Sequence, residues 1–276
     1  MFFKTPNTEV MAMDFEDVLY EKRDHVARIQ INRSEVFNAF RTKTLEELTL
    51  AVKDASDDDS VGVIVISGAP GGRKPSFCSG GDINEMLELT PNSGRRFVMK
   101  LYTLFQNIRN TPKPVVAAVD GFCLGGGNEI NLVCDMTLAT ERSLFGQVGP
   151  TVGSIPVLAG TQLLPRLVGD KKAKEIIFLC KRYSARQAMD MGWINEVVPD
   201  DEFEQSIDQW CKRMLEMSPQ SLKIAKTSMN FESDLLHPSF THGIEALSLT
   251  YGSDELTEGM QAFLEKRKPD FNKFRK

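Results

Sequence analysis

The chain has 276 residues, of which 41% are hydrophobic and 26% charged, and its formal net charge is −5. This is enough apolar material for one large domain, or a large domain with a small satellite. The acidic balance argues against a broad nucleic-acid-binding face. The five cysteines are scattered without CxxC pairing, which indicates neither a disulfide framework nor a zinc site.

The N-terminal stretch contains Lys4, Pro6 and several acids without a sustained apolar segment, so it is not expected to be a signal peptide. Residues 1–13 are interpreted as a loose leader. No run of eighteen apolar residues predicts a transmembrane helix. These features favour a cytoplasmic protein.

The first predicted elements are two strands of a hairpin, at 18–20 and 26–31, the second of which alternates apolar and polar residues. Residues 42–55 carry leucines and valine at helical spacing and predict a helix capped by Thr42. The acidic run at 57–60 ends that helix.

A continuous apolar run at 61–66 predicts a strand buried on both faces, and a glycine-rich loop follows from Gly68 to Gly81. A helix is predicted over roughly 95–110. The pattern then recurs, with a strand at 114–119, glycines at 125–127 and a helix over 128–135. Strand, glycine turn and helix in this order predict an α/β core with parallel strands.

The pattern becomes helical from about residue 170. Helices are expected at 171–180, 184–191, 201–217 and 219–230. The predicted organisation is a leader, an α/β core over 14–200 and a helical C-terminal region over 201–276.

Two glycine motifs are candidates for chemistry: FCSGGD at 77–82 and GGGNE at 125–129. Adjacent glycines let backbone amides approach a ligand, and a helix start adds unpaired N–H groups. Two such turns facing each other would form an oxyanion hole. Either motif by itself is more often a tight strand-to-helix turn than a site.

The blocks PSFCSGGDINEM, KPVVAAVDGFCLGGGNEINLVCDMTLATERSLFGQ, GTQLLPRLVG and ARQAMDMGWINEVVP resemble the enoyl-CoA hydratase/isomerase (crotonase) superfamily over nearly the whole chain. The resemblance implies an α/β spiral of β-β-α units with a helical C-terminal trimerisation region. It also implies a homo-oligomer, a trimer or hexamer. The oxyanion amides would belong to Gly81 and Gly126. Coenzyme A would be part of the substrate, and neither a metal nor another cofactor would be needed.

Hydratases of this superfamily typically use two glutamates. Glu129 matches the first, and the second position is occupied by Gly149. Two carboxylates would share the proton traffic of adding water to a double bond. With one, Glu129 must serve as both base and acid, or another group must help. The structural alternative is a first-turn glutamate favoured by the helix dipole.

The block FGQVGPTVGS and the tail EGMQAFLEKRKPDFNKFRK resemble one branch of the superfamily. It contains dihydroxynaphthoyl-CoA synthase, ketocyclohexanecarboxyl-CoA hydrolase and the oxocyclohexenecarbonyl-CoA hydrolases, and it implies cyclic acyl-CoA substrates from aromatic or alicyclic acids. By position, Ser154 matches a site serine, Tyr251 a tyrosine that a neighbouring subunit can lend, and Lys266 a lysine near the CoA phosphates.

Four positions differ from one or more members of that branch. Pro156 stands where the naphthoate synthases and the ketocyclohexane hydrolase carry an aspartate. Val148 and Ala159 stand where some synthases bind bicarbonate through threonine and tryptophan. Glu129 is retained where the synthases lack an acid. The sequence is a hybrid within the branch.

The lead hypothesis is a lyase that reversibly hydrates an enoyl- or dienoyl-CoA, with cyclic acyl groups included. Substrate or CoA contacts are expected from Ser79, Asp82, Gln147, Gly149 and Lys266. One alternative is ring opening or ring closure of a cyclic β-oxoacyl-CoA. Another is a non-catalytic scaffold that binds acyl-CoA or RNA.

Overall fold

The structure is a computed structural model that describes residues 14–275, so the predicted leader lies outside the described residues. Within them, one sheet has six strands in the order β1-β2-β3-β5-β7-β10. They are Val18–Arg23 (β1), Val26–Ile31 (β2), Val63–Gly68 (β3), Val115–Val119 (β5), Met136–Thr140 (β7) and Glu196–Val198 (β10). A second sheet, in the order β4-β6-β8-β9, has four. They are Ser76–Cys78 (β4), Phe122–Leu124 (β6), Leu144–Gly146 (β8) and Tyr183–Ser184 (β9).

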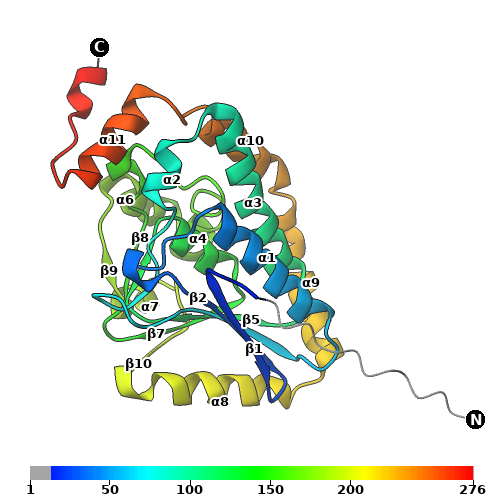
Figure 1. Cartoon of the computed structure of the whole chain (residues 1–276). Coiled ribbons are helices and arrows are strands. Elements are labelled where there is room, and N and C mark those ends of the chain that lie inside the picture. Colours follow the sequence, from blue (N-terminus) through cyan, green and yellow to red (C-terminus); the bar gives the residue numbers. More distant parts are fainter. Residues whose placement is uncertain (1–13, 276) are drawn as a thin grey trace, which may run out of the picture.

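Helices cover and connect the sheets (Figure 1). In chain order they are Thr42–Asp57 (α1), Ile83–Leu87 (α2), Pro91–Asn110 (α3), Gly126–Val133 (α4), Leu164–Val168 (α5), Asp170–Leu179 (α6), Ala185–Asp190 (α7), Phe203–Leu215 (α8), Pro219–Asp234 (α9), His237–Ser248 (α10) and Asp254–Leu264 (α11). Short 3-10 turns occur at Ser34–Val36, Gly149–Val152, Asp200–Glu202 and Phe271–Phe274. No helix of the described residues is long and apolar enough to cross a membrane.

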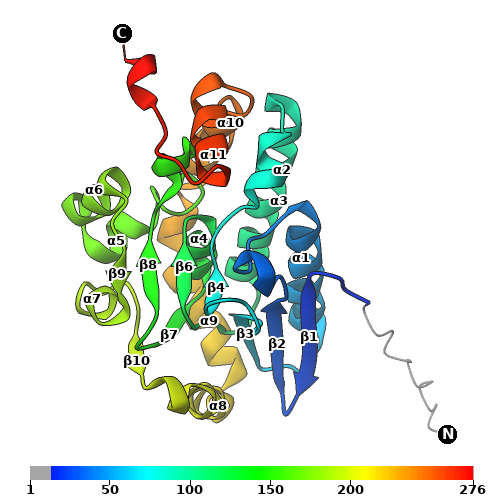
Figure 2. The same cartoon turned by 60° about the vertical axis from the view of Figure 1, so that its left-hand side comes forward.

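The chain repeats one structural unit as it winds through the two sheets. β3, β5 and β7 lie side by side and parallel in the first sheet, and β4, β6 and β8 do the same in the second (Figure 2). Each strand of the first set is followed in the chain by one of the second. This confirms the expected α/β spiral of β-β-α units, although no repeat is visible in the amino-acid sequence.

The central strands are buried on both faces, as their continuous apolar runs predict. In β3, Ile64 and Ile66 belong to the main core under α1 and α3, whereas Val63 and Val65 belong to a smaller cluster with α8. Figure 1 shows α8 lying along this other face of the sheet. The alternation follows from the two-residue period of a strand.

The hairpin, the buried strands and the helices predicted between 42 and 230 are all present, with boundary shifts. The predicted Thr42 cap is wrong. Arg41 is the N-cap residue of α1, and the Thr44 side chain accepts a hydrogen bond from its backbone N–H. The helix expected from residue 95 begins at Pro91, because Thr90 caps it and proline is favoured in a first turn.

The C-terminal helices extend over the end of the core that carries the glycine turns. α10 packs on α3, and α11 contacts α2 and the turn Gly149–Val152. Both figures show α10 and α11 at this end, opposite α8. The C-terminal region therefore forms part of the wall around the candidate site.

Candidate active site

The first glycine turn leaves the backbone amide of Gly81 without a partner among the described residues. Phe40 N–H donates to Gly80 O (2.9 Å), and Asp82 N–H donates to Phe40 O (2.8 Å), which forms an isolated parallel bridge between Phe40 and Gly81. In this pattern the peptide groups of Gly81 itself point away from Phe40. Within residues 14–275 the Gly81 N–H has no hydrogen-bond partner.

The second turn brings an amide to the same place. Gly126 is the first residue of α4, so its N–H has no partner within the helix. A Cβ built on Gly80 would lie 3.3 Å from the Gly126 nitrogen, so the two turns are in contact. A Cβ on Gly126 would itself lie 2.6 Å from the Phe40 ring. Glycine is required at residue 126 because a Cβ would collide with the Phe40 ring, and it is favoured at residue 80, where φ is +110°.

The carboxyl group of Glu129 lies beside these amides. Its Oε1 accepts hydrogen bonds from the N–H groups of Leu158 (3.0 Å), Ala159 (3.1 Å) and Gly160 (3.1 Å). The side chain is only 5% exposed. Burial raises the pKa of Glu129 to about 7 from an ordinary 4.5, although the three N–H groups act to lower it. Such an acid can gain or lose a proton near neutral pH.

Glu129, Gly81 and Gly126 line one inner cavity of about 60 Å³. Its remaining lining is mostly apolar. It consists of Phe40, Met86, Phe97, Val98, Leu101, Gly125, Gln147, Gly149, Ser154, Ile155, Pro156, Leu247 and Tyr251. Aromatic and aliphatic walls around one carboxyl and two amides are the composition expected of a small-molecule site.

Gln147 is an exception to normal hydrogen bonding in this lining. Its side chain is fully buried, yet neither its Oε1 nor its Nε2 has a partner among the described residues. The Nε2 lies 3.2 Å from where a Cβ of Gly160 would be, next to the turn that holds Glu129. A buried unpaired amide is costly in free energy, so a bound molecule that pairs with it would be stabilised.

A larger outer cavity of about 530 Å³ shares Gly81, Gly126, Gly149 and Ser154 with the inner one. Ser79 and Asp82 also line it. The Ser79 N–H donates to Phe37 O, and the Asp82 carboxylate caps α2 through Asn84 N–H and pairs with Arg33 (2.9 Å). The two cavities therefore adjoin each other at these residues.

Most site residues expected from the sequence therefore lie together, with two qualifications. Tyr251 lies in the inner cavity of its own chain and needs no neighbouring subunit to reach it. Lys266 lies in the turn just after α11 and lines neither cavity, although Phe263 and Leu264 at the end of α11 line the outer one. Met86 of α2 lines both cavities.

Some neighbours of the site could not be identified from the sequence pattern. They include Phe40, which fixes the first turn, and the backbone of 158–160, which holds Glu129. The GTQLLPRLVG block contains Gly160, but nothing in it indicates that its amide faces a glutamate. No group of three or more His, Cys, Asp or Glu suited to a metal ion occurs in residues 14–275.

The model of the family described as enoyl-CoA hydratase/isomerase matches residues 21–274. The chain belongs to this family, the crotonases, and is one of its enzymes. The fold is similar to an enoyl-CoA hydratase from Mycobacterium avium subsp. paratuberculosis K-10 (28% identity, TM-score 0.85, covering 93% of this chain and 99% of that one). An enoyl-CoA hydratase/isomerase from Xanthobacter autotrophicus Py2 has 31% identity and a TM-score of 0.83 (91% and 94% covered). An enoyl-CoA hydratase from Bacillus anthracis has 30% identity and a TM-score of 0.75 (93% and 99%).

Proposed function

We propose that this protein catalyses the reversible addition of water to the double bond of an enoyl-CoA thioester. The observation that carries the proposal is one buried carboxyl, that of Glu129, in the same cavity as the unpaired N–H groups of Gly81 and Gly126. The similarity to solved enoyl-CoA hydratases supports the same reaction.

In this proposal the amides of Gly81 and Gly126 bind the thioester oxygen. Hydrogen-bond donors that are already in position stabilise the negative charge that develops on this oxygen. One such donor typically contributes about 10²–10³-fold in rate. The pantetheine and nucleotide parts of CoA would occupy the outer cavity, with Ser79 and Asp82 in its wall. Lys266 remains a candidate partner for the CoA phosphates.

The ionised Glu129 takes a proton from water as the water oxygen bonds to Cβ of the substrate. The electrons of the double bond move to the thioester oxygen and form an enolate. Protonated Glu129 then returns the proton to Cα, which restores the carbonyl and the free carboxylate. One carboxyl with a pKa of about 7 can perform both steps near neutral pH.

Water needs a second partner opposite Glu129, since Gly149 provides no side chain. We assign this role to the Gln147 amide, whose oxygen and nitrogen are both unpaired beside the inner cavity. Ser154 and Tyr251 offer further hydroxyl groups in the same lining. An amide can hold water without competing with Glu129 for its proton.

The inner cavity of about 60 Å³ is small, with room for a few water molecules. A short acyl chain fits with small adjustments, whereas a cyclic acyl group requires flexible lining residues such as Met86 to move. We therefore propose cyclic enoyl- and dienoyl-CoAs as further substrates, to be tested after short-chain enoyl-CoAs.

Hydration of crotonyl-CoA and of cyclic enoyl-CoAs by the purified protein tests this function directly. We expect hydroxyacyl-CoA products from the wild type and a loss of about 10³-fold or more in Glu129→Gln. Glu47→Gln, which alters another buried glutamate that accepts backbone N–H groups but lies outside both cavities, is the matched control. No hydration of any substrate, or full activity of Glu129→Gln, contradicts the proposal.

Ring opening or ring closure of a cyclic β-oxoacyl-CoA is the second candidate. It is favoured by the position of Gly149 and Ser154, both from the FGQVGPTVGS block, in the inner wall. Mass spectrometry separates the reactions, because hydration leaves the ring intact and hydrolytic cleavage gives an open-chain diacid thioester.

We also propose that the protein assembles into a trimer or hexamer. Three large apolar side chains of α9 are exposed: Ile224 (58%), Met229 (81%) and Phe231 (69%). Ile224 and Phe231 are seven residues apart and so share one face of the helix, and apolar side chains that gather on an exposed face are expected at an interface. Light scattering after size exclusion should give three or six chains, with Phe231→Glu shifting the mass downward; a monomeric wild type contradicts this.

A further inference from the structure

One arginine connects the two backbone segments that form the first glycine turn. Arg33 donates through Nη1 to Ala39 O (2.6 Å) and through Nη2 to Asp82 Oδ2 (2.9 Å). The side chains of Arg33 and Asp82 are each 11% exposed. A planar guanidinium with several donors can hold two acceptors in a fixed relative position.

The two acceptors flank the bridge that orients Gly81. Ala39 O belongs to the same peptide group as the Phe40 N–H, which bonds to Gly80 O. Asp82 follows Gly81 directly, and its own N–H bonds to Phe40 O. Arg33 therefore holds both sides of the bridge, and the Gly81 N–H projects from between them.

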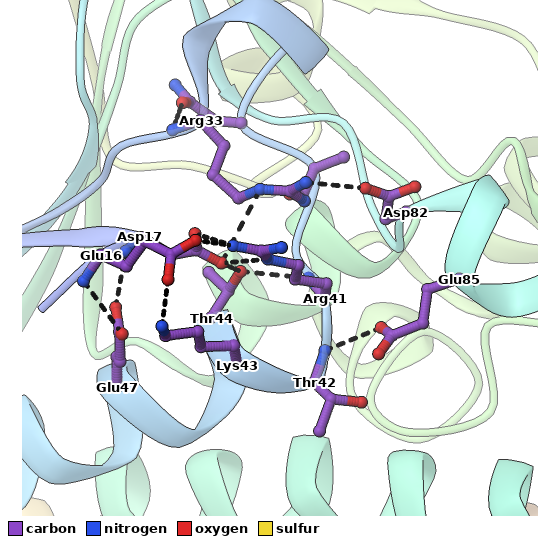
Figure 3. Close-up of polar contacts among 12 residues, drawn as sticks. Glu16, Asp17, Arg33, Arg41, Thr42, Lys43, Thr44, Glu47, Asp82 and Glu85 are labelled. Atoms are coloured by element: carbon purple, nitrogen blue, oxygen red, sulfur yellow. Dashed lines mark hydrogen bonds and ion pairs between the residues drawn. The ribbon is translucent and has the colours of Figure 1, made fainter.

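Further ion pairs and hydrogen bonds connect the residues around Arg33 (Figure 3). Asp17 lies 3.7 Å from Arg33 Nε and also accepts from Arg41 Nε (2.8 Å) and from the Thr44 hydroxyl (2.6 Å). Glu85 of α2 accepts from Thr42 N–H (2.7 Å). The start of α1, the glycine turn and α2 are thus connected through side chains.

We propose that Arg33 is a positioning residue for the oxyanion hole, acting through Asp82 and the Ala39 peptide to fix the direction of the Gly81 N–H. Arg33 lines neither cavity, so it does not contact a bound thioester. Its effect must therefore pass through the backbone of the turn. Hydrogen-bond catalysis is sensitive to such placement, because a shift of about 1 Å can cost about 10²-fold in rate.

The test compares Arg33→Met with Arg33→Lys and Asp82→Asn. Methionine removes both contacts, lysine can restore the ion pair but not the forked geometry, and asparagine can keep the α2 cap while weakening the ion pair. We expect kcat for enoyl-CoA hydration to fall about 10- to 100-fold in Arg33→Met, with KM little changed. Arg33→Lys should lie between it and the wild type. Arg33→Met/Asp82→Asn should lose no more than Arg33→Met alone, because both act through one contact.

The enolate of acetoacetyl-CoA absorbs in the near ultraviolet. The absorbance of the bound compound therefore measures enolate formation without depending on turnover. The bound fraction present as enolate reports how well the amides stabilise an oxyanion. It should fall in Arg33→Met in proportion to kcat. Arg142→Met breaks another arginine–aspartate pair, with Asp120 (2.6 Å), away from both cavities, and should leave enolate absorbance and kcat unchanged.

The inference is wrong if Arg33→Met folds and keeps wild-type kcat and enolate absorbance. If Arg33→Met does not fold, the same result in Arg33→Lys and Asp82→Asn contradicts the inference. It is equally wrong if Arg142→Met lowers both to the same extent. The inference rests on the proposed oxyanion hole, but the two can fail separately. A wild type that binds acetoacetyl-CoA as its enolate without hydrating any enoyl-CoA overturns the proposed reaction and leaves the role of Arg33 intact.

Discussion

Gly94 of α3 lies directly against the ring of Tyr251, so that a Cβ on Gly94 would be 2.2 Å from Tyr251 Cδ2. Tyr251 is 2% exposed and lines the cavity that contains Glu129. Burial raises the pKa of its phenol, and the nearby Glu129 carboxylate raises it further, so the hydroxyl stays protonated as a donor. The absence of a side chain at residue 94 thus allows the C-terminal region to reach the site.

Gly94→Ala should displace this ring. Overpacking typically costs about 1–3 kcal/mol, which should outweigh the gain of about 1 kcal/mol from replacing glycine in a helix. We expect a lower free energy of unfolding by chemical denaturation and reduced hydration activity. Gly94→Ala/Tyr251→Leu should recover stability but not activity. If Gly94→Ala alone is as stable and active as the wild type, the Tyr251 ring does not exclude a side chain at residue 94.

Gln147→Leu should separate stability from function. Leucine removes a buried amide without partners, whose burial costs about 1–3 kcal/mol, so the free protein should become more stable. Hydration of crotonyl-CoA should fall because water loses a partner. Exchange of the α-proton of butyryl-CoA with deuterated solvent, which needs only Glu129 and the two amides, should persist. Gln162→Leu, which alters a buried glutamine outside both cavities, is the control and should change both rates in parallel.

Activity and stability should respond oppositely to pH through Glu129. Its pKa in the folded protein is about 7 against an ordinary 4.5, so between these values the folded state binds more protons than the unfolded state. Stability from this group is therefore present at low pH and is lost as pH rises through about 7. Hydration should instead rise over the same range, because the base must be ionised.

Glu129→Gln removes this ionisation. Relative to the wild type, the variant should gain about 2–3 kcal/mol of unfolding free energy between pH 5 and pH 8. Denaturant unfolding at several pH values measures the difference. A stability difference that stays constant with pH would show that Glu129 titrates normally.

Lys226 should be the main anchor of α9. Its ammonium group donates to Ile108 O (2.9 Å), Lys113 O (3.0 Å) and Asp135 Oδ2 (2.7 Å), and its side chain is 8% exposed. Lys226→Met leaves Asp135 and two carbonyls without this partner, so we expect a loss of about 3–5 kcal/mol. Hydrogen exchange should increase first in α9. Lys223→Met on the same helix serves as the control.

The amino-acid sequence determined the local elements and the chemistry they carry. Alternating and continuous apolar runs predicted β2, β3 and β5, because burial on one or both faces selects these patterns. Adjacent glycines marked Gly81 and Gly126, since only glycine permits such close backbone approach. The short strands of the second sheet, with two or three residues each, gave no periodicity to detect.

Only the tertiary structure decided what surrounds Glu129. The turn that binds its carboxyl lies 29–31 residues later in the chain, and the Arg33–Asp82 pair joins residues 49 apart. The burial that raises its pKa comes from side chains contributed by several elements. Sequence patterns report neighbours within one strand or helix, whereas these contacts depend on how distant segments pack against one another.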